Sequence, residues 1–182
     1  MKRFSLKNIV APKGFSLSGV HCGLKKSQRK DLGLIFSRLP CIACGMFTAN
    51  KVQAESLKVC REHLKHRQSR AVVVNSGNAN CFTGQKGIDA CRDITRAIAE
   101  KLGIDRKSVL IASTGIIGKP LPVQKIKQGI PELCQGLGAS KVKDFAESIM
   151  TTDTFKKCVS LKIRLKNKPV LITGFAKGAG MI

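Results

Sequence analysis

The sequence contains no tryptophan and no tyrosine, and its 11 acidic residues are far outnumbered by 33 lysines and arginines. The resulting net charge of +22 is typical of proteins that bind nucleic acids or anionic membrane surfaces. Without Trp or Tyr, however, the chain has few side chains on which unpaired bases could stack, and its basic residues are scattered among apolar positions. We interpret the charge as a solvated basic surface and expect no nucleic-acid partner. A basic RNA- or DNA-binding protein stays the non-enzyme alternative.

The chain also lacks an apolar run of about 20 residues, the length that a membrane-spanning helix needs. Its basic first seven residues are followed by the segment 8–14 and not by a long apolar core, so we expect neither a secretory signal nor a membrane contact. The eight cysteines favour reduced thiols and a cytoplasmic location. Cys41 and Cys44 have C-x-x-C spacing, but no second pair or suitably placed histidine follows. We therefore expect buried strand cysteines and no metal site.

No complete catalytic unit is evident. None of the 3 histidines lies near a serine motif, the carboxylates are not clustered, and no phosphate-binding G-x-x-x-x-G-K-[ST] motif occurs. If the chain belongs to an enzyme, a nucleophile with its base is missing from it. This gap directs attention to the last residues, Ala176–Ile182, which follow a predicted strand and end on Gly-Met-Ile. They lead us to expect half of an enzyme.

The hydrophobic pattern predicts a single domain over residues 1–182, without a linker or repeat. Apolar runs in residues 16–48 suggest an antiparallel meander, broken by the basic turn 25–30. Steps of three and four residues between Ile88 and Leu102 predict an amphipathic helix that stops at Gly103. The other predicted elements are helices over 55–65, 123–133 (interrupted at Pro131) and 142–150, and strands over 71–74, 108–112, 159–165 and 169–175. His63 and His66 are expected at the C-terminal end of the first of these helices.

Polar segments that follow these elements are the candidates for a functional site. Asn75–Asn80 is read most simply as a tight turn. In Ser113-Thr114-Gly115, backbone N–H groups and the threonine hydroxyl could stabilise an oxyanion, and a helix N-cap explains the same residues equally well. Thr151–Asp153 could likewise be a cap. Lys177, placed between Ala and Gly beside a strand end, suits a ligand carboxylate.

Five segments together point to one protein family. They are Ala11–Phe15, Val73–Asn80, Ala112–Gly118, Ile149–Thr154 and Ala176–Ile182. On these segments, in this order and over almost its whole length, the chain resembles the α chain of the ornithine acetyltransferase family, also called glutamate N-acetyltransferases, of arginine biosynthesis. Mild departures are Cys81-Phe82 and Ala179, where the family more often has small residues and serine, respectively. The strong positive charge is also atypical.

The resemblance implies an α+β fold, an αββα sandwich of the N-terminal-nucleophile type that is completed by a β chain and commonly assembled as α2β2. Family precursors cut themselves before a threonine just beyond the Gly-Met-Ile motif. The new N-terminal threonine then carries an acetyl group from N-acetylornithine to glutamate, with its own α-amino group as the base. This chain would then be inactive alone, either as a processed α chain or as a truncated remnant.

The same resemblance assigns roles to four residues. Thr114 and Gly115 correspond to the oxyanion-hole pair, and Thr151 and Lys177 to substrate-binding positions. No cofactor and no metal are implied, and acetyl-CoA stays open as a co-substrate. A second enzyme hypothesis keeps the architecture for hydrolysis, as in N-terminal-nucleophile aminopeptidases, but the carboxylate site at Lys177 favours acetyl transfer.

Overall fold

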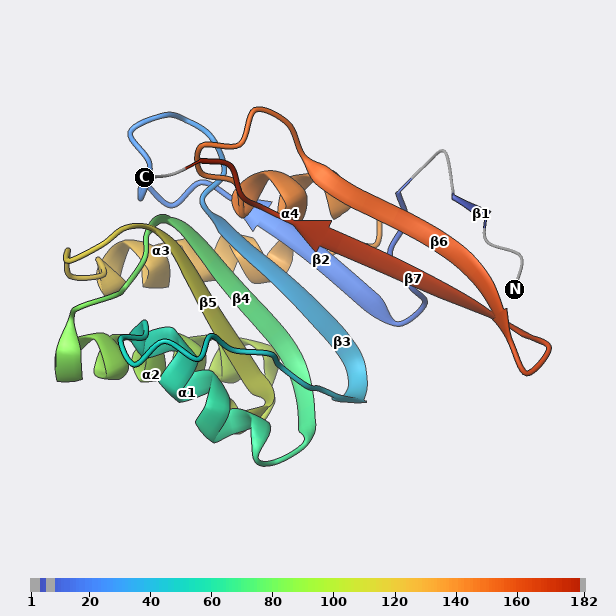
Figure 1. The fold of residues 1–182 in the computed structure, drawn as a ribbon, viewed down its shortest axis with the longest axis horizontal. Coiled ribbons are helices and arrows are strands. Elements are labelled where there is room, and N and C mark those ends of the chain that lie inside the picture. The colour runs from blue at the N-terminus through green and yellow to red at the C-terminus, as the bar shows by residue number, and fades with distance from the viewer. Residues whose placement is uncertain (1–3, 6–8, 181–182) are drawn as a thin grey trace.

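Two β-sheets organise the computed structural model, which describes residues 4–5 and 9–180 (Figure 1). The larger sheet has the order β2 (Phe15–Val20), β3 (Leu32–Ile42), β4 (Gln68–Asn78), β5 (Val109–Ile116). The smaller sheet has the order β1 (Phe4–Ser5), β6 (Lys157–Leu165), β7 (Lys168–Ala176). The helices are α1 (Glu55–Leu64), α2 (Gly84–Leu102), α3 (Val123–Gln135), α4 (Val142–Ser148) and the short 3-10 helix η1 (Arg106–Ser108). The predicted α+β class is thus confirmed.

The larger sheet is mixed. β2 to β4 pair antiparallel, with Leu34 opposite Val73, whereas β4 and β5 pair parallel, with Val73 opposite Ile111. Parallel neighbours need a long crossover connection, and α2 provides it. The predicted meander is therefore only partly right: β2 and β3 form its hairpin, but residues 43–54 contain no regular element.

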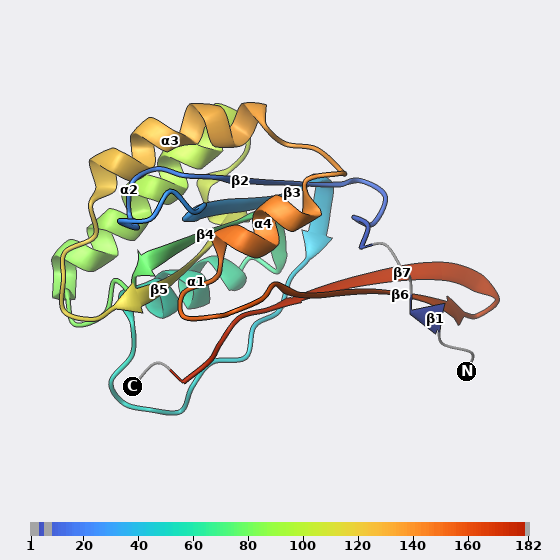
Figure 2. The same cartoon turned by 90° about the horizontal axis from the view of Figure 1, so that it is seen from above.

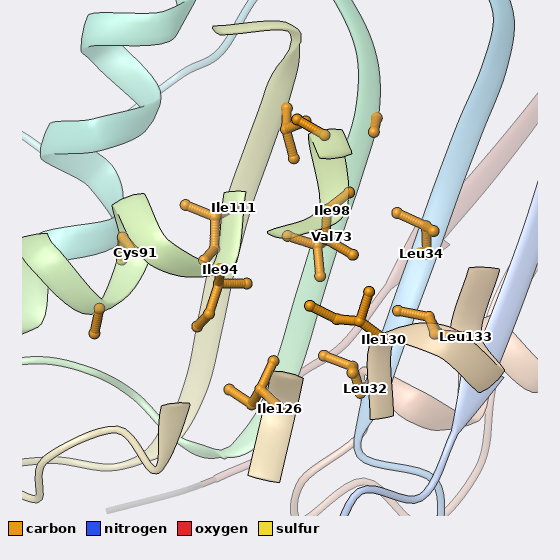
Figure 3. Close-up of a cluster of buried hydrophobic side chains, with 14 of the residues drawn as sticks. Leu32, Leu34, Val73, Cys91, Ile94, Ile98, Ile111, Ile126, Ile130 and Leu133 are labelled. Atoms are coloured by element: carbon orange, nitrogen blue, oxygen red, sulfur yellow. The ribbon is translucent and has the colours of Figure 1, made fainter. Parts of the chain in front are cut away.

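The main core lies between this sheet and the helices α2 and α3. Figure 3 shows strand side chains directed toward residues of both helices; the labelled ones are Leu32, Leu34, Val73, Cys91, Ile94, Ile98, Ile111, Ile126, Ile130 and Leu133. The apolar stripe predicted from Ile88 to Leu102 is confirmed, since its central residues are buried. Gly103 ends α2 in the left-handed conformation, as predicted for a C-terminal stop.

Helix α1 covers the free edge of β5. The thiol of Cys60 lies 2.9 Å from the carbonyl oxygen of Ile111 and 3.2 Å from its amide nitrogen, and His63 Nδ1 lies 2.7 Å from the carbonyl oxygen of Val109. An edge strand exposes unpaired backbone groups, so these two side chains take the place of a neighbouring strand. His63 is in the last turn of α1, which confirms the position predicted for it.

On the opposite face of the larger sheet, α4 packs against β2 and β3, and Phe175 near the end of β7 joins the same apolar cluster. Figure 2 shows the β6–β7 hairpin on the side of that sheet away from α2 and α3, and projecting well beyond it. A Cβ on Gly19 would lie 2.3 Å from the carbonyl oxygen of Asp144, so only glycine lets α4 approach this closely. Phe145 of α4 makes an edge-to-face contact with Phe175 of β7, at 4.9 Å between ring centroids. This contact fastens the end of β7 to the main body.

Two predictions about local structure are wrong. α3 runs through Pro131 without a break, because Ile126, Ile130 and Leu133 are buried against the sheet and this packing outweighs the hydrogen bond that proline removes. Cys41 is only half-buried and Cys44 is exposed, because the last residues of β3 run beyond the core after a register shift between Phe36 and Cys41.

Within residues 4–5 and 9–180, no helix has both the length and the apolar character that crossing a bilayer requires.

Candidate functional site

The candidate site lies where the parallel strands β4 and β5 end. Thr114 lies opposite Ser76, and Gly115 lies opposite Gly77. The predicted tight turn at 75–80 is therefore wrong in part, since β4 continues to Asn78. The strand predicted over 108–112 likewise extends further, because β5 continues through Ser113, Thr114 and Gly115 to Ile116. These polar residues favour turns in isolation, but backbone pairing between β4 and β5 holds them in strand conformation. The ladder becomes irregular only after Gly77, where Asn78 pairs with both Thr114 and Ile116.

Gly77 and Gly115 lie opposite each other at this end of the sheet, with no room for a side chain on Gly115. A Cβ on Gly115 would lie 2.4 Å from the carbonyl carbon of Gly77 and 2.6 Å from the amide nitrogen of Asn78. Gly115 also has a φ of +135°, which side-chain-bearing residues rarely adopt. The helix N-cap interpretation of these residues is wrong, because α3 begins only at Val123, after Pro122.

Three of the four predicted site residues meet at one ammonium group. Lys177 Nζ donates to Thr114 Oγ1 at 2.8 Å and to Thr151 Oγ1 at 2.9 Å. Gly115 follows Thr114 directly in β5. Lys177 comes from the segment after β7 and Thr151 from the segment after α4, so three distant parts of the chain converge. Lys177 is half-buried and, in the part of the chain that the structure describes, makes no ion pair.

Asp153 holds the two segments that carry Thr151 and Lys177. Its buried carboxylate accepts hydrogen bonds from the backbone N–H groups of Thr151 at 3.1 Å and Gly178 at 2.7 Å, and from Lys157 Nζ at 2.5 Å. Burial alone would raise the pKa of Asp153, but these three donors outweigh it and hold the pKa well below the usual range. The interpretation of Thr151–Asp153 as a helix cap is wrong, because the elements that follow are the strands β6 and β7.

The asparagine-rich end of β4 ties the site to the loop after β5. Ser113 Oγ donates to Asn75 Oδ1 at 2.6 Å, and Asn75 Nδ2 donates to the carbonyl oxygen of Asn78 at 2.8 Å. Asn78 Nδ2 in turn reaches the carbonyl oxygens of Lys119 and Pro120 at 3.2 and 3.1 Å. These bonds fix the backbone on both sides of Thr114 and Gly115.

Two open pockets lie at the site, and the predicted site residues are divided between them. One, of about 520 Å³, is lined by Thr114 and Lys177 together with apolar side chains, among them Val74 and Phe175. The other, of about 540 Å³, is lined by Gly115 and Thr151 together with Lys25, Lys26 and Lys119. Among the lining residues there is no histidine, cysteine or carboxylate. The described residues also include no group of three or more metal-ligating side chains close enough to hold an ion. The pockets can thus bind an anion and stabilise negative charge, but they hold no nucleophile with its base.

Comparisons with known proteins show the family of this chain. The sequence profile of the ArgJ family matches residues 16–182. The chain is 44% identical over 174 residues to the arginine biosynthesis bifunctional protein ArgJ of Caldanaerobacter subterraneus subsp. tengcongensis, covering 96% of this chain and 43% of that protein. It is 46% identical over 176 residues to the ArgJ protein of Thermotoga neapolitana, covering 96% and 44%. The chain spans less than half the length of these relatives.

Two solved structures share the whole fold. The arginine biosynthesis bifunctional protein argJ of Bacillus halodurans matches with a TM-score of 0.93 at 38% identity, covering 100% of this chain and 96% of that chain. The ornithine acetyltransferase of Mycobacterium tuberculosis, solved in complex with ornithine, matches with a TM-score of 0.90 at 32% identity, covering 100% and 97%. The family profile, the curated relatives and the two solved structures lead to the same conclusion: this chain belongs to the ArgJ family.

Proposed function

We propose that this chain is the α chain of a glutamate N-acetyltransferase, an acyltransferase that moves an acetyl group from N-acetylornithine to glutamate. One observation carries the proposal. The half-buried ammonium of Lys177 bridges Thr114 and Thr151 and makes no ion pair within the described ranges, beside a glycine whose backbone is held tightly in place. A lysine has three donors, so one N–H of Lys177 is left for a substrate carboxylate.

Thr114 and Gly115 are proposed to stabilise the negative charge that develops on the acetyl carbonyl oxygen. The Thr114 hydroxyl oxygen accepts from Lys177, so its own O–H is free to donate to that oxygen. The neighbouring ammonium makes this O–H a stronger donor. Such fixed donors act where charge appears in the transition state, and this is the main way in which they accelerate acyl transfer.

The nucleophile is proposed to come from a β chain. In the first half-reaction, the hydroxyl of its N-terminal threonine attacks the acetyl carbonyl, the adjacent amine takes the proton, and ornithine leaves with that proton. In the second, the amine of glutamate attacks the acyl-threonine ester and the threonine oxygen is protonated. No histidine is needed, which agrees with the lining of the two pockets.

Exposed apolar surface supports a β-chain partner in an α2β2 assembly. In the β6–β7 hairpin, Val159, Leu165 and Ile172 are 43%, 58% and 48% exposed. Beside the site, Ala112 of β5 is exposed and lines the pocket of Thr114 and Lys177. Contiguous exposed apolar side chains on a sheet commonly mark an interaction surface.

The 8 free cysteines suit a reducing compartment, and we propose the cytoplasm.

Reconstitution tests this function. We expect co-expression of the chain with a family β chain to give transfer of acetyl groups from N-acetylornithine to glutamate. Lys177→Ala should raise KM for N-acetylornithine by about tenfold or more, because a charged hydrogen bond to the substrate is lost. Lys127→Ala, at an exposed position of α3, removes the same charge and should leave KM unchanged.

Three outcomes separate the alternatives. Release of acetate without transfer to glutamate would favour hydrolysis. Transfer from acetyl-CoA as well as from N-acetylornithine would add a second donor. If an assembled complex with intact Thr114 and Gly115 shows no transfer and no hydrolysis, the acetyltransferase proposal is rejected and an inactive remnant is favoured.

A further inference from the structure

Four lysines in the described part of the chain are half-buried: Lys25, Lys30, Lys157 and Lys177. Lys30 pairs with Asp144 at 2.7 Å, and Lys157 pairs with Asp153 at 2.5 Å. Lys25 and Lys177, in contrast, have no carboxylate oxygen within 4.0 Å among the described residues. A partly buried charge is costly unless it is paired, so a bound anion would stabilise both ammonium groups. The proposed function uses Lys177 and leaves Lys25 unused.

The surroundings of Lys25 contain carboxylates, but each is already engaged. The carboxylates of Asp31, Glu147 and Asp153 attract the Lys25 ammonium electrostatically but form no ion pair with it. Asp31 accepts from backbone N–H groups, Glu147 pairs with Lys156 at 3.1 Å, and Asp153 pairs with Lys157. The only hydrogen bond found for Lys25 Nζ within the described ranges goes to a neutral acceptor, the carbonyl oxygen of Lys30, at 2.7 Å.

Lys25 is held in place by a rigid loop. The carboxylate of Asp31, which is fully buried, accepts from the backbone N–H groups of Cys22 at 2.7 Å, Leu24 at 2.8 Å and Lys25 at 3.0 Å. This folds the loop between β2 and β3 over the end of β4. A Cβ on Gly77 would lie 3.1 Å from the carbonyl oxygen of Leu24 and 3.4 Å from Lys25 Cγ. The stem of Lys25 therefore lies directly on Gly77, which itself contacts Gly115.

Lys25 also faces a space large enough for a ligand group. The pocket of about 540 Å³ that it lines also contains Thr151 and Gly115. Two exposed lysines on its wall, Lys26 and Lys119, add positive charge, and no carboxylate lines it. Thr151 is also the residue to which Lys177 donates. The two unpaired ammonium groups thus belong to adjoining pockets on either side of the Thr114–Gly115 pair.

We propose that Lys25 forms a second anion subsite, which binds a carboxylate or phosphate group in the pocket lined by Gly115 and Thr151. A reactant with one carboxylate at Lys177 would place a second anionic group at Lys25, so the subsite favours acidic reactants over those with a cationic side chain. Only this identification of the ligand as a reactant rests on the proposed function. The anion subsite itself rests on the position of Lys25.

Direct binding to the 182-residue protein tests the subsite without catalysis. Glutarate, a dicarboxylate without an amine, and inorganic phosphate would be titrated by calorimetry into the wild type and into Lys25→Met, which keeps the apolar stem on Gly77 but removes the charge. We expect at least one anion to bind the wild type and to bind Lys25→Met about tenfold to a hundredfold more weakly. Lys25→Arg, which restores the charge, and Lys127→Ala, the charge-matched control on α3, should bind as the wild type does.

The two anions distinguish the sources of the ligand group. Loss of glutarate binding alone identifies a carboxylate subsite, and loss of phosphate binding alone identifies a phosphate subsite. Unchanged affinity of Lys25→Met for both anions would overturn the proposal, as would the absence of binding of either anion to the wild type.

A measurement on the wild type covers the case in which Lys25→Met fails to fold. At a limiting concentration of an amine-reactive ester, a saturating bound anion should protect Lys25 from acylation but leave Lys127 unprotected, as read by mass spectrometry. Equal labelling of Lys25 with and without anion would again reject the subsite. If anions bind at Lys25 but the reconstituted enzyme transfers no acetyl group, the proposed function fails and the subsite stands.

Discussion

Gly77 and Gly115 face each other across β4 and β5 so closely that a Cβ on Gly115 would lie 2.4 Å from the carbonyl carbon of Gly77. This contact places the backbone of Gly115 beside the Thr114 hydroxyl that Lys177 approaches. The oxyanion-hole geometry that we propose thus depends on two glycines from different strands, and it is sensitive to single added atoms.

Gly115→Ala is therefore expected to destabilise the protein by about 2–4 kcal/mol, from backbone strain at a φ of +135° and from overpacking against Gly77. Urea unfolding measures the loss. Gly118→Ala is a matched control, because Gly118 also has a positive φ, of +78°, but has nothing within 4 Å of its added Cβ. It should cost only the strain, about 1–2 kcal/mol. Equal losses in both variants would show that the contact with Gly77 is unimportant.

Thr114→Val tests the hydroxyl beside Lys177. It keeps the size and β-branching of the side chain but removes the acceptor of the 2.8 Å bond and the proposed oxyanion donor. In the assembled enzyme we expect kcat to fall roughly a hundredfold to a thousandfold, the usual loss for one such donor. Thr154→Val makes the same substitution at an exposed position three residues after Thr151 and should leave kcat unchanged. A fall in kcat of less than about threefold for Thr114→Val would remove Thr114 from the proposed mechanism.

Asp153→Asn tests the carboxylate that ties the segments of Thr151 and Lys177 together. The folded-state pKa of Asp153 is lowered, so its stabilisation is complete above the unfolded-state pKa of about 3.9 and is lost as the pH falls through the lower folded-state value. At pH 7 we expect a loss of about 2–3 kcal/mol in the free energy of unfolding, because charge-assisted hydrogen bonds are removed.

The pH series supplies the check on Asp153. The difference in stability between wild type and Asp153→Asn should shrink as the pH is lowered below about 4. Asp89→Asn, at an exposed position of α2, should change stability by no more than about 0.5 kcal/mol at any pH. A difference that stays constant down to pH 2 would mean that the charge of Asp153 does not contribute.

The free thiols should differ sharply in reactivity. Burial raises the pKa of Cys60 and raises that of Cys91 to about 12, so both stay protonated and shielded at neutral pH. Cys44 is exposed. We expect iodoacetamide to modify Cys44 first in the native protein and Cys60 and Cys91 only after unfolding, as followed by peptide mass spectrometry. Labelling of Cys60 at the rate of Cys44 would contradict the covering of β5 by α1.

The elements with strong periodicity could be predicted from the sequence because their pattern records which face is buried. α2 with its stop at Gly103, and the hairpin strands β6 and β7, are in the structure close to where the pattern predicts them. The extension of β4 and β5 into polar residues could not be predicted this way. Their strand conformation comes from pairing with each other, which local propensity does not contain.

The sequence by itself determined the family, because the five segments that carry the resemblance are defined by residues and spacing along the chain. The same segments contain Thr114, Gly115, Thr151 and Lys177, the residues predicted for the site. Only the tertiary structure decided that Lys177 bridges two threonines, that Asp153 fastens the segments that carry Thr151 and Lys177, and that Lys25 lies unpaired beside the same site. The physical reason is separation along the chain. The two bonds of Lys177 join residues 63 and 26 positions apart, and the bond between Asp153 and Gly178 joins residues 25 positions apart. Lys25 is left without an ion pair among the described residues because other segments neutralise the nearby carboxylates, and no local pattern predicts such contacts.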